Sequence, residues 1–223
     1  NVNQKCNYTP CIFEYIYFAR PDSIVDNILV HDARISMGRF LGKKLTKMDL
    51  INDIDYVTYI PYTARTSALG VAMEINKDFK EVIVRNRYID RTFIMPTQKL
   101  RKLSINRKLN IIKSLVKGKN ILLIDDSIVR GNTSKNIIKR LRECGVKKIV
   151  FGSVSPIVKF PNIYGIDIAT KKELLSYNKN LEDMRKILNV DKLVYQSIED
   201  ITKSIMKFNN ELDGFEDSTF SGK

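Results

Sequence analysis

Two adjacent carboxylates are the most distinctive chemical groups in this sequence. Asp125 and Asp126 directly follow the apolar run at 121–124, which is typical of a parallel strand with both faces buried. In open α/β sheets, ligands bind at the carboxyl ends of such strands. Gly131 lies just before a predicted helix start at 133–134 that carries two hydroxyls. Free amides, the positive helix end and hydroxyls can hold a phosphate there, so the loop offers anions on one side and an anion-binding site on the other.

This layout indicates the kind of ligand. A molecule with hydroxyls or a metal ion at one end and a phosphate at the other would fit, and a ribose 5-phosphate has that arrangement. Two carboxylates alone could merely cap a turn, but the strand before them and the Gly131-x-Thr133-Ser134 sequence after them favour a binding site. The loop is not a Walker loop, because no Gly-Lys-Thr/Ser ends it, and it lacks the Gly-x-Gly-x-x-Gly dinucleotide fingerprint.

The surrounding elements indicate an α/β fold. β-Branched, aromatic and aliphatic runs predict strands at 12–18, 56–60, 81–84, 119–126, 147–155 and 192–195. Apolar periodicity predicts helices at 32–45, 64–75, 134–144, 170–175, 181–188 and 197–208. Strand, helix and strand in close succession form a βαβ unit, which implies a mostly parallel sheet. Residues 85–109 are rich in Arg and Lys without clear periodicity, which is typical of a functional or disordered segment, and the end after Leu212 is predicted to fray.

Composition excludes several classes of protein. Of 223 residues, 43% are hydrophobic, which is enough for one sizeable core. Three cysteines cannot make a disulfide framework, and the polar start at 1–10 is no signal peptide. No apolar run approaches the roughly 20 residues that span a bilayer, so a cytoplasmic protein without a membrane partner is expected. The net charge of +13 favours anionic partners, although codon bias in an AT-rich genome would also enrich Lys, Asn and Ile.

Residues 125–134 also carry a resemblance to a known family. The string Asp-Asp-Ser-Ile-Val-Arg-Gly-Asn-Thr-Ser resembles the phosphoribosyl pyrophosphate (PRPP) motif of type I phosphoribosyltransferases. More narrowly, it is similar to that of the glutamine PRPP amidotransferase (amidophosphoribosyltransferase) family. Further similar strings lie at 13–23, 86–88, 91–96 and 160–167. The resemblance therefore runs from about Pro10 to the end of the chain.

The resemblance implies a type I phosphoribosyltransferase fold, with a mostly parallel central sheet flanked by helices, a mobile lid loop and a helical C-terminal extension. We divide the chain into a linker remnant at 1–12, a core at 13–175 with the lid at 85–109, and an extension with tail at 176–223. In this family a separate N-terminal glutaminase domain releases ammonia from glutamine. We interpret this chain as the transferase half without that domain.

The implied activity is transfer of the phosphoribosyl group from PRPP to ammonia. The products are 5-phosphoribosylamine and pyrophosphate, in the first step of de novo purine (IMP) biosynthesis. Glutamine would serve only through the glutaminase domain or chain, which is an expected partner. A homo-oligomer is also expected from the resemblance.

The resemblance assigns roles to individual residues. One Mg²⁺, held by Thr63, Asp125 and Asp126, would neutralise the leaving pyrophosphate. The catalytic residues implied are Asp125, Asp126, Arg85 and Tyr88. The substrate-binding residues implied are Ser127, Arg130, Gly131, Asn132, Thr133, Ser134, Arg87, Arg91 and Arg101. Without the resemblance, Thr63 would be interpreted as a helix N-cap and the arginines of the lid as a solvated basic loop.

Four positions depart from the family pattern. Arg85 stands where Lys is usual, and Asp90 stands where Gly is usual. Asn132 replaces a usual Thr but keeps a polar group at the phosphate site. Tyr62 replaces a usual acidic residue in the pyrophosphate loop, which puts part of that loop in question.

One branch of the family carries an iron–sulfur cluster. Cys11 matches the first ligand position of that cluster. Asn162, Asp213 and Glu216 stand where the other cysteines would be, so no cluster is expected.

Three other functions compete with an active amidotransferase. These are a PRPP-binding regulator, a catalytically inactive subunit, and a phosphoribosyltransferase for a nucleobase. The strings at 13–15 and 91–96 argue against the nucleobase enzyme. A nucleic-acid partner is not expected, because no helix-turn-helix or aromatic nucleic-acid motif accompanies the positive charge.

Overall fold

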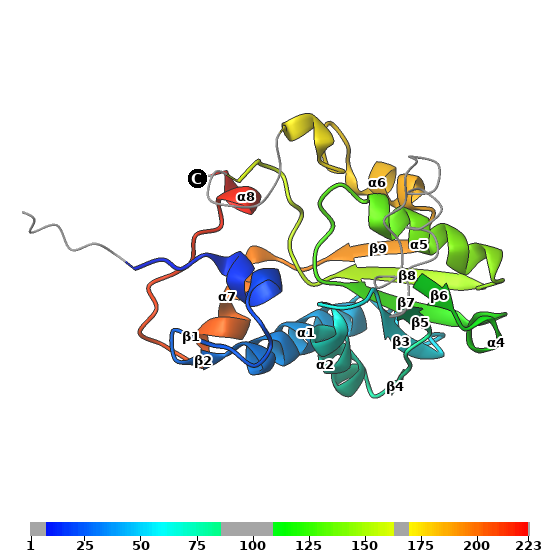
Figure 1. Cartoon of the computed structure of the whole chain (residues 1–223), viewed down its shortest axis with the longest axis horizontal. Coiled ribbons are helices and arrows are strands. Elements are labelled where there is room, and N and C mark those ends of the chain that lie inside the picture. The colour runs from blue at the N-terminus through cyan, green and yellow to red at the C-terminus, as the bar shows by residue number, and fades with distance from the viewer. Residues whose placement is uncertain (1–7, 86–108, 163–169, 223) are drawn as a thin grey trace, which may run out of the picture.

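The computed structural model describes residues 8–85, 109–162 and 170–222, and these form an α/β structure around a five-stranded sheet (Figure 1). The strand order is β4 (Asp78–Phe79), β3 (Tyr56–Tyr59), β7 (Asn120–Asp125), β8 (Lys148–Ser153) and β9 (Lys192–Tyr195). All neighbouring strands in this sheet pair in parallel, as the βαβ pattern predicts.

Helices cover both faces of the sheet. One face carries α1 (Val30–Lys47), α2 (Arg65–Ile75) and α7 (Ile198–Met206), and the other carries α5 (Asn132–Glu143) and α6 (Leu181–Leu188) (Figure 1). Along β7, Leu122 and Ile124 belong to the apolar cluster on the α1 side, whereas Ile121 and Leu123 belong to the cluster on the α5 side. Successive side chains of a strand point to opposite faces, so burial on both faces explains the continuous apolar run at 121–124.

Shorter elements surround this framework. They are η1 (Glu14–Phe18), β1 (Ile24–Val25), β2 (Ile28–Leu29), β5 (Ile83–Arg85), β6 (Leu109–Ile111), α4 (Lys113–Val116), η3 (Lys171–Glu173) and α8 (Ser218–Ser221). β1 pairs with β2, and β5 pairs with β6, in two antiparallel ribbons outside the main sheet.

The strand predicted at 12–18 is wrong. Glu14–Phe18 forms a short π-helix, in which the Ala19 amide donates to the Glu14 carbonyl at 3.0 Å. Tyr15 and Ile16 are buried in the core although they pair with no strand. Burial against the core therefore explains the aromatic and β-branched composition that suggested a strand.

Two other predicted elements are only partly confirmed. The strand predicted at 81–84 forms as β5, but it pairs with β6 rather than with the parallel sheet. The helix predicted at 170–175 shortens to the single 3₁₀ turn η3. Most of the predicted lid, 86–108, lies outside the described residues.

The end of the chain does not fray as predicted. Phe220 is buried and stacks on Phe13 with ring centroids 5.1 Å apart. Glu216 forms a backbone bridge with Cys11, and its amide donates to the Pro10 carbonyl at 2.9 Å. The polar composition after Leu212 therefore conceals a segment that is attached to the core by the rings of Phe215 and Phe220 and by backbone hydrogen bonds.

The segment 176–223, interpreted as an extension, contributes to the central sheet. Its strand β9 pairs in parallel with β8, with Phe151 opposite Leu193. Its helix α6 supplies Met184 and Leu188 to the cluster on the α5 side. The core and this segment thus share one sheet and one apolar interior, while the proposed boundary at 175 stays a prediction.

Candidate active site

The predicted carboxylates lie in a cleft at the carboxyl end of the sheet. Asp125 is the last residue of β7, and Asp126 begins the loop that leads to α5. The cleft has a volume of about 850 Å³, which is within the usual range for small-molecule sites. Its lining residues are Phe13, Tyr17, Phe18, Ile60, Pro61, Tyr62, Thr63 and all ten residues from 125 to 134.

Neighbouring strands hold the carboxylate loop in place. The Ile60 amide, just after β3, donates to the Ile124 carbonyl at 2.9 Å. On the other side, the amides of Val154 and Ser155 donate to the carbonyls of Asp125 and Asp126 at 2.9 and 2.8 Å. The backbone of both aspartates is therefore fixed by the loop after β8, as expected of a site at a parallel-sheet edge.

Each carboxylate accepts specific hydrogen bonds within the site. The two oxygens of Asp125 accept from the Asp126 amide at 3.0 Å and from the Ser134 hydroxyl at 3.1 Å. Asp126 accepts from the Ser127 hydroxyl at 2.9 Å, and the Thr63 hydroxyl lies close enough to lower its pKa. Only 7% and 6% of the two aspartates is exposed, so little water is available to solvate their charges.

Burial makes two neighbouring negative charges unfavourable here. It raises the pKa of Asp125 well above the ordinary range, and the Asp126 charge raises it further, although the Ser134 hydroxyl opposes both effects. Burial also raises the pKa of Asp126, against the effects of Thr63, Ser127 and the Arg34 cation. A divalent cation would relieve this repulsion, because hard cations prefer carboxylate and hydroxyl oxygens.

The chain alone would supply few ligands to such a cation. Within 8–85, 109–162 and 170–222, no group of three or more His, Cys, Asp or Glu side chains is arranged to hold a metal. Asp125, Asp126 and the Thr63 hydroxyl fit an ion that keeps waters or takes substrate oxygens as its remaining ligands, which is how Mg²⁺ is usually bound.

The other side of the loop is built to accept an anion. Gly131 caps the N-terminus of α5 with φ of +73°, a left-handed conformation that favours glycine. A Cβ at this position would also lie 3.1 Å from a methyl of Leu175. Asn132 and Thr133 are exposed in the first turn. The first-turn amides of this 12-residue helix have no intrahelical acceptor, so they are available to a phosphate.

The remaining predicted residues divide into three groups. Ser127 and Ser134 line the cleft, but their hydroxyls donate to the two aspartates. Arg130 lies at the rim, where its Nη2 donates to Glu173 at 3.1 Å. The third group falls outside the described residues and consists of Arg87, Tyr88, Asp90, Arg91 and Arg101, together with the side chain of Arg85.

The structure excludes one of the two interpretations of Thr63. The N-cap of α2 is Ala64, and no side chain caps the helix. The Thr63 hydroxyl instead lines the cleft and lowers the pKa of Asp126. The N-cap alternative is therefore wrong, and the loop after β3 contributes to the site.

Sequence analysis missed one wall of the cleft, which Phe13, Tyr17 and Phe18 form from η1. Tyr62, which the sequence placed in the pyrophosphate loop, lines the cleft from the loop after β3. Behind η1 lies Arg34, a fully buried cation that acts on Asp126. The aromatic string at 13–18 was visible in the sequence, but its interpretation as a strand concealed its place at the cleft.

The positions that hold iron–sulfur ligands in one branch of the family carry other groups here. Burial raises the pKa of the Cys11 thiol, and the nearby Glu216 carboxylate raises it further. Asp213 is exposed. A pair of one thiol and one carboxylate gives no reason to expect a cluster, and its absence stays a prediction.

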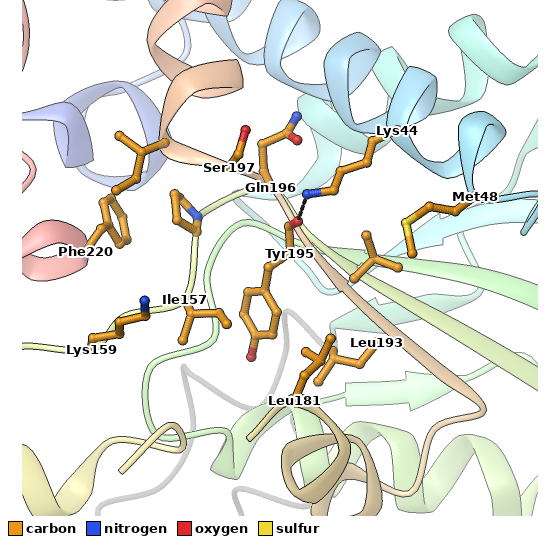
Figure 2. A pocket seen from close by; sticks show the side chains of 13 residues that line it. Lys44, Met48, Ile157, Lys159, Leu181, Leu193, Tyr195, Gln196, Ser197 and Phe220 are labelled. Atoms are coloured by element: carbon orange, nitrogen blue, oxygen red, sulfur yellow. Dashed lines mark hydrogen bonds between the residues drawn. The ribbon is translucent and has the colours of Figure 1, made fainter. Parts of the chain in front are cut away.

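A second cavity, of about 360 Å³, lies beside β9 (Figure 2). Apolar side chains such as Leu181 and Leu193 form most of its wall, and Lys44 donates to the Tyr195 carbonyl at 2.7 Å at its edge. None of the predicted site residues lines it. The motif cleft is therefore the better candidate for catalysis.

The described helices include none that is both long and apolar enough to cross a membrane. This agrees with the hydropathy of the sequence.

Comparison with known proteins finds relatives along nearly the whole chain. The amidophosphoribosyltransferase of Pasteurella multocida (strain Pm70) is 47% identical over 219 residues, which cover 98% of this chain and 44% of the relative. That of Escherichia coli (strain K12) is 44% identical over 213 residues, which cover 96% of this chain and 42% of the relative. No protein-family model matches the chain.

The fold matches solved structures of the same kind. A glutamine PRPP amidotransferase from B. subtilis, complexed with ADP and GMP, superposes with a TM-score of 0.84 at 36% identity. The match covers 97% of this chain and 47% of that chain, so this chain spans less than half the length of these relatives. The predicted phosphoribosyltransferase fold is confirmed. This chain corresponds to the C-terminal phosphoribosyltransferase part of the amidophosphoribosyltransferase family.

Proposed function

We propose that this chain transfers the phosphoribosyl group of PRPP to ammonia, which gives 5-phosphoribosylamine and releases pyrophosphate. This would be the first step of de novo purine synthesis. The observation that carries the proposal is the cleft in which buried Asp125 and Asp126 face the free amides at the start of α5. The names of the relatives give the reaction class.

The chain's own residues would bind the two ends of PRPP. The first-turn amides of α5, with Asn132 and Thr133, would receive the 5-phosphate. Asp125 and Asp126 would accept hydrogen bonds from the ribose hydroxyls. Because these groups belong to one short loop, the sugar between them would be held in one orientation, which lowers the entropic cost of reaching the transition state.

The reaction breaks the bond between ribose carbon 1 and the pyrophosphate oxygen, and carbon 1 then carries positive character, as glycosyl centres do. Bound Mg²⁺, held by Thr63, Asp125 and Asp126, would supply charge neutralisation of the leaving pyrophosphate. Ionised Asp125 and Asp126 near the ribose would also stabilise the developing positive charge. Ammonia forms the new bond to carbon 1 and loses one proton.

Further roles rest on the resemblance. Arg85, Arg87, Tyr88, Arg91 and Arg101 are proposed to contact the pyrophosphate from the segment that closes over PRPP. Closure would exclude water, which competes with ammonia for carbon 1. A glutaminase domain or chain that supplies ammonia, assembly into a homo-oligomer and a cytoplasmic location are likewise proposals.

The test is PRPP consumption with Mg²⁺ in the presence of ammonium, of glutamine, or of neither. We expect pyrophosphate and phosphoribosylamine with ammonium, little turnover with glutamine, and loss of activity on chelation of Mg²⁺. Asp126→Asn should abolish turnover, whereas Asp78→Asn, at an exposed position on β4, should not. Absence of ammonium-dependent turnover would refute the proposal, and turnover with a purine or pyrimidine base would replace it with a nucleobase transferase.

A further inference from the structure

Arg34 has an unusual environment for an arginine. It lies on α1 with none of its surface exposed, and within the described part of the chain it forms no ion pair within hydrogen-bonding distance. Burial lowers the pKa of Arg34, and the nearby Asp126 carboxylate opposes that change. The guanidinium nevertheless stays charged, because arginine keeps its proton in proteins. A buried charge without a close counter-ion is costly, so its contacts call for an explanation.

The contacts of Arg34 are with the backbone of one segment. Its Nε donates to the Tyr15 carbonyl at 2.8 Å, and its Nη2 donates to the Ala19 carbonyl at 2.9 Å. The Tyr15 carbonyl lies within η1 and the Ala19 carbonyl at its C-cap, and a helix this short leaves such acceptors unsatisfied. Hydrogen bonds from a charged donor are stronger than those between neutral groups, so the two contacts hold η1 against α1.

The same segment forms the aromatic wall of the cleft, defined here as Phe13, Tyr17 and Phe18. The Phe18 ring lies 6.1 Å from that of Phe13 and 5.5 Å from that of Tyr17. Tyr17 and Phe18 are 46% and 43% exposed, so apolar packing alone does not fix their positions. Arg34 holds the backbone on either side of them, at Tyr15 and Ala19, and does not itself line the cleft.

We propose that Arg34 is a positioning residue, which holds the aromatic wall in place beside the Asp125–Asp126 loop and thereby limits access of water to the reacting carbon. This inference rests on the proposed transfer to ammonia. If the wall shifts, water can attack carbon 1 of PRPP in place of ammonia. The bond to pyrophosphate then breaks as before, and ribose 5-phosphate and pyrophosphate form with loss of a proton from the attacking water.

The two outcomes can be measured separately in one assay. Pyrophosphate reports all turnover of PRPP, and phosphoribosylamine reports transfer to ammonia, so the difference between them is hydrolysis. We expect Arg34→Met to lower kcat for amination on the order of tenfold or more, since small displacements in an active site have such effects. The hydrolysed share should rise severalfold while KM for PRPP changes little. Arg34→Lys should restore part of the loss, because its ammonium can still donate to one carbonyl.

Arg142 provides a matched control. Its guanidinium also donates to backbone carbonyls, those of Lys147 and Asn189 at 3.2–3.3 Å, and it pairs with the Asp191 carboxylate at 2.6 Å. Its side chain is 24% exposed and lies away from the cleft. Arg142→Met should reduce stability and leave the hydrolysed share unchanged. A similar rise in hydrolysis for Arg142→Met would mean that general loosening of the fold is responsible, and it would overturn the inference.

Phe18→Ala tests the wall directly at a position that is 43% exposed, where truncation is compatible with folding. It should raise the hydrolysed share, and adding Arg34→Met should raise it no further, since both changes act on one structure. If Arg34→Met does not fold, the hydrolysed share in Arg34→Lys and in Phe18→Ala tests the role of Arg34. An unchanged hydrolysed share in an active Arg34 variant, or in Phe18→Ala, would overturn the role of Arg34. A wild-type chain without ammonium-dependent turnover would instead refute the proposed function.

Discussion

Asp125→Asn should make the protein more stable while it removes activity. Asp125 is buried beside Asp126, and burial together with the neighbouring charge raises the pKa of its carboxyl well above the ordinary value of 3.8. Wherever both carboxyls are ionised, the folded chain therefore contains an unfavourable pair of charges. An uncharged amide of the same shape removes one of the two charges.

The hydrogen bonds of the position should survive this substitution. The Asn oxygen can accept from the Asp126 amide, as the carboxylate does at 3.0 Å. The Asn amide group can donate to the Ser134 hydroxyl, which now donates to Asp125 at 3.1 Å and can reverse its role. The net effect is then mainly the loss of electrostatic repulsion. Stabilising substitutions in active sites are worth about 0.5–2 kcal/mol. For a chain of this size, each kcal/mol raises Tm by about 2–4 °C.

The pH dependence gives the sign of the effect. Because the pKa of Asp125 is higher in the folded than in the unfolded chain, the folded chain binds this proton more tightly, and wild-type stability rises as pH falls through the raised pKa. The gain from Asp125→Asn should therefore be largest above that pKa and shrink toward 3.8. Thermal unfolding of both proteins between pH 5 and pH 8 would measure it.

Asp78→Asn is the control for this experiment. The Asp78 carboxylate is 73% exposed and lies 3.5 Å from Lys80, a surface pair that contributes little. Its Tm should stay close to that of the wild type at each pH. A lower Tm for Asp125→Asn at pH 8, or a gain that does not change with pH, would refute the electrostatic explanation.

Three further predictions test other parts of the structure. Gly131 and Gly118 share φ of +73°, so Gly131→Ala and Gly118→Ala should each lower the free energy of unfolding in denaturant by about 1–2 kcal/mol. Only Gly131→Ala should also weaken binding of PRPP with Mg²⁺. Equal binding by both variants would contradict a phosphate site at α5. Phe220→Ala should cost about 3–5 kcal/mol, whereas a frayed end would lose nothing. Burial alone would raise the pKa of Asp191, but the Ile149 amide and the Arg142 guanidinium hold it below the ordinary 3.8. Asp191→Asn should therefore lower the free energy of unfolding by about 1 kcal/mol near neutral pH. This difference between the two proteins should disappear when unfolding is measured at pH values that fall below 3.8.

The sequence was most informative where burial leaves a regular pattern. The apolar run at 121–124 predicts β7 because a strand covered on both faces needs an apolar side chain at every position. The carboxylates after it and the glycine before α5 then predict the cleft, since chain geometry brings them into one short loop. The groups that form this part of the cleft are neighbours in the sequence, so the cleft can be predicted without knowledge of any tertiary contact.

Where side chains are placed by distant parts of the chain, prediction failed. The composition of 12–18 suits either a strand or a turn packed on the core, and only the packing of η1 distinguishes them. Phe220 is one of only two aromatic residues in a polar segment, so no period reveals its burial. Arg34 has the residue type of a solvated helix face, and its contacts with Tyr15 and Ala19 come from a segment 15–19 residues away.

The site combines two features that an isolated chain satisfies poorly. Asp125 and Asp126 repel each other at one end, and the amides at the start of α5 lack acceptors at the other. A ligand with a divalent cation at one end and a phosphate at the other would satisfy both, so binding of PRPP with Mg²⁺ should raise the Tm of the wild type in proportion to the logarithm of its concentration. Asp125→Asn has already lost the repulsion and one carboxylate, so it should gain much less from the same ligand. Differential scanning fluorimetry with PRPP, with Mg²⁺ and with both would compare the two proteins, and an equal gain would mean that the ligand does not bind through these carboxylates.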